Sequence, residues 1–120
     1  MPSRAILTQI ITKSRFGEHH EEISLSEPTC IDQIGIGAMP VSVAHTPPVI
    51  QVFGLGEDGA WVPLTPPQAQ PEAGVATTAL PHPALVRAVR LSGKYQTVPL
   101  TLRGFALRSF ASAAGRASPA

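Results

Sequence analysis

The chain has 120 residues, a formal net charge of +1, 43% hydrophobic residues and 14% charged residues. This length predicts one domain with a single core, and the high apolar share with low net charge excludes a disordered chain. The 13 prolines and 10 glycines recur too often for long helices. Cys30 is the only cysteine, so no disulfide forms within the chain. No apolar run approaches the roughly 20 residues of a membrane helix, and we expect no membrane contact.

The first part of the chain is predicted to form an arm. Its apolar residues fit one stripe of a short helix and fit an extended segment equally well. They are Ile6, Leu7, Ile10, Ile11 and Phe16. Because the polar run from 17 to 22 separates them from the rest of the chain, we expect an arm over residues 1–22, a sandwich domain over 23–110 and a flexible tail over 111–120. The apolar arm side chains are candidate contacts with neighbouring subunits.

The sequence after the arm is typical of short antiparallel strands. Val49–Leu55 and Trp61–Leu64 flank an Asp-Gly pair, which suits a hairpin loop. Val98–Arg103 alternates apolar and other side chains with the period of a half-buried strand. Further strands are expected over Ile34–Met39, Val41–His45, Leu85–Leu91 and Gln96–Arg103, with a turn over Ser92–Tyr95 and a surface connection over Pro66–Pro71. The predicted fold class is all-β, an antiparallel β-sandwich of jelly-roll or immunoglobulin-like type.

Four residues are predicted to be structural core. Val98, Leu100 and Leu102 occupy alternate positions of one strand, and Trp61 follows the tight turn. Trp61 has two interpretations, either a large core residue that holds the hairpin against the opposite sheet or an exposed aromatic ring that stacks on a sugar. The core interpretation is favoured, because a single tryptophan beside a tight turn of a small sandwich is more often buried.

No catalytic residue, metal ligand or cofactor motif is predicted. Gly54–Gly59 matches the Gly-x-Gly-x-x-Gly fingerprint, but the prolines after it exclude the helix that would hold a pyrophosphate. The run His19–Glu22 offers four adjacent ligand types on a loop, and such neighbours rarely converge on one ion. Cys30 has no basic neighbour to activate its thiol, so we expect a buried, unreactive cysteine. We expect no enzymatic activity and no cofactor.

Charge is distributed unevenly along the chain. Residues 1–60 carry 3 basic and 7 acidic residues, a balance of −4, whereas residues 61–120 carry 6 basic residues and 1 acidic residue, a balance of +5. Such halves can attract copies of the chain or another neighbour, although both sets of charges fit a solvated surface equally well. We expect a homo-oligomer. Four arginines of the second half are candidate assembly contacts: Arg87, Arg90, Arg103 and Arg108. They are too few, and aromatics too sparse, to favour nucleic-acid binding.

The features of the second half succeed one another in a recognisable order. There is a strand, a turn, a Trp-containing strand, a Thr-rich connection, an Arg-bearing strand and a Thr-Leu-Arg strand. They are Val49–Leu55, Glu57-Asp58-Gly59, Trp61–Leu64, Val75–Leu80, Leu85–Arg90 and Val98–Arg103. This order, over about half of the chain, resembles the small β-sandwich domains of virion structural proteins from tailed bacteriophages. Glu57 stands where Asn is usual in that pattern.

The resemblance implies a non-enzymatic virion protein, and first a capsid decoration or cement protein that binds and stabilises the head shell. The implied partners are other virion proteins, above all the major capsid protein, and the implied location is a virion assembled in the host cytoplasm. A head-fibre, neck or tail accessory protein is the alternative within the family. The residues by themselves fit a carbohydrate-binding or adhesion module equally well, and the response of Trp61 fluorescence to glycans would distinguish the two classes.

Overall fold

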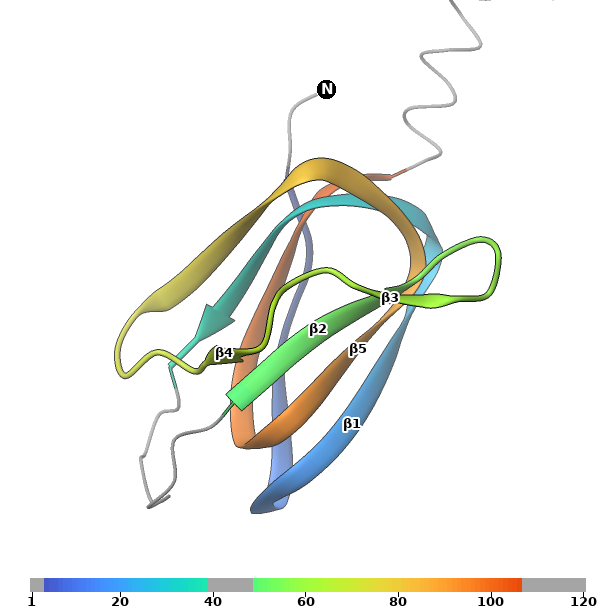
Figure 1. The fold of residues 1–120 in the computed structure, drawn as a ribbon. Helices are drawn as coiled ribbons and strands as arrows, with labels where there is room; N and C mark the ends of the chain where they lie inside the picture. The colour runs from blue at the N-terminus through green and yellow to red at the C-terminus, as the bar shows by residue number, and fades with distance from the viewer. Residues whose placement is uncertain (1–3, 39–48, 107–120) are drawn as a thin grey trace, which may run out of the picture.

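The computed structural model describes residues 4–38 and 49–106, and every regular element in these ranges is a strand (Figure 1). Two strands are long and bent, β1 (Arg4–Gly37) and β5 (Val75–Ala106). The other three are short, namely β2 (Val49–Leu55), β3 (Trp61–Pro63) and β4 (Gln68–Ala69). The described ranges contain no helix with the length and apolar character that a membrane crossing requires.

The long strands bend from one sheet of a sandwich into the other. In the first sheet the 97–106 segment of β5 lies between the 4–12 and 29–37 segments of β1. The 29–37 segment also pairs, on its other side, with the 75–86 segment of β5. Shifts of register after Thr12 and after Ser24 mark the places where β1 leaves one sheet for the other.

The second sheet contains the remaining segments. The 88–95 segment of β5 lies between the 17–24 segment of β1 and β2, and β2 pairs on its far side with β3 and β4. Without β4, the eight segments in chain order are 4–12, 17–24, 29–37, β2, β3, 75–86, 88–95 and 97–106. Numbered in this way, the first sheet has the strand order 1-8-3-6 and the second sheet has the order 2-7-4-5. This order is that of a jelly roll. The predicted antiparallel β-sandwich is therefore confirmed, and of the two predicted types the chain adopts the jelly roll.

Alternate residues of each strand fill the core between the sheets. In β2, Ile50 and Val52 are buried while Gln51 and Phe53 face outward. The core consists of Ile11, Ile31, Ile34, Ile36, Ile50, Val52, Leu64, Val86, Val89, Leu91, Tyr95, Val98, Leu100 and Leu102. Trp61 is not part of it. Trp61 pairs with Leu55, which belongs to the outward set of β2, and its ring is half-buried at the outer surface.

Residues 4–22 belong to the sandwich and do not form a separate arm. The 4–12 segment pairs with 97–104, and the 17–24 segment pairs with 88–95. Ile11 is 3% exposed and Leu7 packs against the core, whereas Ile10 is 64% exposed. This alternation is that of a half-buried strand, so the ambiguous apolar pattern is resolved as extended. Ile6 and Phe16 are half-buried.

The β2–β3 hairpin forms as predicted. Its loop runs through Gly59, which has a φ of 84° and donates its N–H to the Gly56 carbonyl at 3.0 Å. The Asp58 carboxylate accepts the N–H of Ala60 at 3.1 Å. Gly59 alone supplies the positive φ, and Asp58 stabilises the loop through its side chain.

The predicted hairpin between Leu85–Leu91 and Gln96–Arg103 does not form. Residues 92–95 continue the strand instead of turning, and the chain leaves the second sheet for the first near Gln96. Tyr95 is fully buried at this crossing and donates its hydroxyl to the Leu91 carbonyl at 2.9 Å. The predicted strand over 41–45, the tail over 111–120 and Arg108 lie outside the described residues.

Candidate functional site

The outward face of the second sheet brings together side chains from three strands. The register places His20 of β1, Ser92 of β5 and Gln51 of β2 in one row across the sheet. It places Glu22, Arg90 and Phe53 in the next row. Each of these residues alternates along its strand with residues that face the core, so the face combines polar, charged and aromatic groups.

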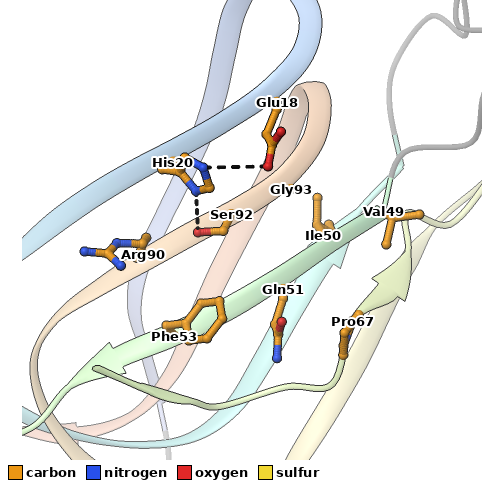
Figure 2. A pocket seen from close by; sticks show the side chains of 10 residues that line it. All are labelled: Glu18, His20, Val49, Ile50, Gln51, Phe53, Pro67, Arg90, Ser92 and Gly93. Carbon is orange, nitrogen blue, oxygen red and sulfur yellow. Dashed lines mark hydrogen bonds and ion pairs between the residues drawn. The ribbon is translucent and has the colours of Figure 1, made fainter. Parts of the chain in front are cut away.

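A hollow of about 350 Å³ lies on this face (Figure 2). Its lining consists of Glu18, His20, Val49, Ile50, Gln51, Phe53, Pro67, Arg90, Ser92 and Gly93. The small side chain of Ser92 and the lack of one at Gly93 leave space between the larger groups of β1 and β2. Gly93 has a φ of 137°, and a Cβ there would meet the Val49 carbonyl oxygen and lie 2.9 Å from Ile50 Cα. Only glycine allows β5 and β2 to approach this closely.

His20 lies between Glu18 and Ser92 at one side of the hollow (Figure 2). Its Nδ1 is 3.0 Å from Ser92 Oγ, which is a hydrogen bond. Its Nε2 is 3.9 Å from Glu18 Oε1, a distance that allows an ion pair when the ring is protonated. The imidazole and the hydroxyl therefore hold each other in place and offer adjacent donor and acceptor groups.

Arg90 connects the hollow to Trp61. Its Nη2 donates to Glu22 Oε1 at 2.8 Å, and its Cζ lies 4.1 Å from the centroid of the Trp61 ring. The guanidinium is therefore engaged by a carboxylate and by an aromatic face at the same time. Most of its positive charge is already balanced, and the Trp61 ring is held beside the hollow.

Gln51 fixes the opposite side of the hollow. Its Nε2 donates to the Thr65 carbonyl at 2.9 Å. Thr65 Oγ1 in turn accepts the N–H of Val52 at 3.1 Å. These two hydrogen bonds hold the connection after β3 against β2, so Pro67 and the Gln51 amide have defined positions in the lining.

Glu18, His20 and Ser92 contain the three groups of a hydrolytic triad, but they are not arranged as one. The 3.9 Å separation between Glu18 and the ring is beyond hydrogen-bond distance. Ser92 and Gly93 pair with β1 on one side and with β2 on the other, so their backbone groups are used in pairing within the sheet. An oxyanion requires free donors beside the nucleophile, and these residues do not provide them. Glu18, His20 and Ser92 therefore lack the geometry of a hydrolytic triad with an oxyanion site.

The described residues contain no group of three or more His, Cys, Asp or Glu side chains placed to hold a metal ion. Within His19–Glu22, which lies in β1, successive side chains point to opposite faces of the strand. His19 contacts the Tyr95 ring at 5.3 Å between centroids, while His20 reaches the hollow. Cys30 is half-buried, and this burial raises the pKa of its thiol, which disfavours the reactive thiolate.

The predicted assembly contacts that fall within the described residues do not gather in one place. Of the arginines, Arg90 lines the hollow, Arg87 is exposed outside it and Arg103 is half-buried in the first sheet. The residues that the sequence interpretation missed are His20, Ser92, Gln51 and Phe53. Alternation within Val49–Leu55 was a signal that Gln51 and Phe53 share a face, but nothing local joined them to His20.

No protein-family model matches this chain, and no curated protein matches it. Several solved structures match it. A family 32 carbohydrate-binding module of Clostridium perfringens NanJ in complex with galactose has a TM-score of 0.64 at 9% identity, over 85% of this chain and 99% of that one. CpGH89CBM32-6, produced by Clostridium perfringens, has a TM-score of 0.57 at 14% identity, over 78% and 74%. The family 32 module of Streptococcus pneumoniae EndoD has a TM-score of 0.54 at 12% identity, over 83% and 94%.

At this level of identity the similarity shows the fold, a β-sandwich of the kind found in family 32 carbohydrate-binding modules. The resemblance to bacteriophage virion proteins is therefore wrong. The short strand and turn motifs on which it rested occur in many sandwiches and do not identify a family. The capsid partners and the virion location were inferred from that resemblance alone, and they lose their basis with it.

Proposed function

We propose that the protein is a non-enzymatic carbohydrate-binding module and that the hollow on its second sheet is the sugar site. The observation that carries the proposal is the position of the Phe53 ring in one lining with the hydrogen-bonded pair His20 and Ser92. A sugar ring offers apolar C–H groups and hydroxyl groups side by side. Its site therefore needs an aromatic surface and a few fixed polar groups, and this lining supplies both.

The fold supports the same proposal. The similar structures are carbohydrate-binding modules, and one of them was solved with galactose bound. Fold similarity at 9–14% identity does not transfer a ligand, so the weight rests on the side chains of the hollow. Their geometry is held by the sheet itself, which gives a preformed site at low entropic cost.

Charge at the hollow favours a neutral sugar. Arg90 is already paired with Glu22 and stacked on Trp61, so its charge is largely balanced. The Glu18 carboxylate lies at the same hollow and repels acidic sugars. We therefore expect binding of neutral hexoses such as galactose, and much weaker binding of sialic or uronic acids.

Isothermal titration calorimetry with galactose and a panel of neutral oligosaccharides tests the proposal. Replacing Phe53 with Ala should weaken binding by about tenfold, because the ring supplies the stacking surface. Ser92→Ala should weaken it by a few-fold through loss of the hydroxyl. Arg87→Ala is the matched control, since Arg87 is an exposed residue of β5, the strand of Ser92, and lies outside the hollow. The only tryptophan, Trp61, provides a second readout through its emission.

If no glycan binds, or if Phe53→Ala binds like the unaltered chain, the hollow is not a sugar site. The non-enzymatic part of the proposal has its own test, turnover of p-nitrophenyl acetate. We expect no turnover above the buffer rate. Hydrolysis that disappears in Ser92→Ala would instead assign a nucleophilic role to that hydroxyl.

A further inference from the structure

Each sheet has two edges that pair with no strand within the described residues, and three of the four edges carry features that oppose further pairing. The 75–86 segment contains Pro81 and Pro83. The 17–24 segment carries three glutamates. On the remaining edge of the second sheet, β3 has 3 residues and β4 has 2, and prolines surround both.

The fourth edge, the 4–12 segment of β1, has no such protection. Between Ala5 and Thr12 it contains no charge, no proline and no glycine. Pairing with β5 is regular from Leu7 onward. Ile10 is 64% exposed on this strand. A regular, uncharged edge rich in β-branched residues is a template for another strand.

We infer that this edge pairs antiparallel with the same edge of a second copy, so that the first sheets of two subunits continue into each other across a twofold axis. A twofold interface requires a strand that is complementary to itself. Alternation along the strand places Leu7, Gln9 and Ile11 on the core-side face, opposite buried residues of β5, with Gln9 exposed at the edge, while Thr8 and Ile10 lie on the outward face. Residues directly opposite each other in an antiparallel pair lie on the same face of the sheet. The twofold axis therefore places one residue opposite its own copy, and it does not place two successive residues opposite each other.

An axis at Gln9 matches the side chains best. It places Leu7 opposite Ile11 of the partner subunit, which extends the two cores into each other. The two Gln9 amides then face each other and can exchange hydrogen bonds. An axis at Ile10 would place Leu7 opposite Lys13 of the partner subunit, and an axis at Thr8 would leave Ile11 opposite only an alanine. The interface lies on the first sheet and is independent of the proposed sugar site on the second.

Light scattering after size-exclusion chromatography of the full chain is the first test, and a dimer is expected. Ile10→Lys should shift the chain to monomer, because each lysine would lie opposite Thr8 of the partner subunit and the two lysines would place like charges diagonally across the new strand pair. Thr77→Lys is the matched control. Thr77 is exposed in the same sheet on the opposite edge strand, and its variant should remain dimeric. Circular dichroism should show that both variants remain folded.

Cross-linking tests the register. In a Cys30→Ser background, Gln9→Cys should form an intermolecular disulfide on oxidation, because residues at the axis bring their Cα atoms within bridging distance. Thr8→Cys should not, since its partner is Ile10. A monomeric full chain, a dimer that survives Ile10→Lys, or cross-linking through residue 8 in place of residue 9 would each overturn the inference. A monomer that dimerises only after removal of residues 107–120 would also overturn it, because the chain's own tail would then cover this edge.

Discussion

The Tyr95 phenol makes the stability of the sandwich depend on pH in the alkaline range. Tyr95 is 0% exposed, and burial raises its pKa from 10.0 to about 12. In the unfolded chain the phenol ionises at its ordinary value, so the folded state holds its proton over a range of pH where the unfolded state does not. The free energy of unfolding is therefore unaffected by Tyr95 below about pH 10, and it falls as the pH rises from 10 toward 12. Two units of pKa correspond to about 2.7 kcal/mol at most.

Chemical denaturation followed by circular dichroism at pH 8 to 12 measures this loss. Tyr95→Phe should remove most of the pH dependence, at a cost near neutral pH of about 1 kcal/mol for the hydrogen bond to the Leu91 carbonyl. Because the chain has one tyrosine, absorbance at 295 nm reports its ionisation directly. A folded-state titration centred near pH 10, or an equal alkaline loss in Tyr95→Phe, would refute this account of the buried phenol.

Three further substitutions test the hollow and the hairpin. Gly93→Ala should lower stability by about 2–4 kcal/mol, since its Cβ would meet β2; an unchanged melting temperature would contradict the close approach of β5 and β2. Gly59→Val should cost about 1–3 kcal/mol, measured by urea denaturation, because a β-branched residue resists a φ of 84°. Trp61→Ala should cost only about 1–2 kcal/mol, because the half-buried ring loses packing and its contact with Arg90; a loss above about 4 kcal/mol would return Trp61 to the core.

Strands with a clear local pattern could be predicted from the sequence. The β2–β3 hairpin follows from its Asp-Gly loop between two apolar runs, and the structure closes it with Gly59 at positive φ. The alternation of Val98, Leu100 and Leu102 likewise places one face of β5 inward, and all three residues are buried. In both cases the information lies within a few residues of the chain.

Strands with an ambiguous or polar local pattern, and the pairing between distant segments, could not be predicted in this way. The 4–12 segment has an ambiguous apolar spacing, and only its pairing with 97–104 makes it a strand. The charged run His19–Glu22 is polar enough for a loop, yet pairing with 88–95 keeps it extended at the sheet edge. Non-local pairing of this kind is what the topology of a jelly roll requires, and a window along the sequence does not contain it.

Gly93 explains why the sequence did not reveal the candidate site. Glycine beside serine and lysine favours a turn, because glycine readily adopts a positive φ. Here the positive φ occurs inside a strand, where the absence of a Cβ lets the Val49 carbonyl approach the backbone of β5. Gly93 also lines the hollow, next to Ser92. A side chain at this position would push β5 and β2 apart, and both strands line the hollow, so stability and binding should be lost in the same variants.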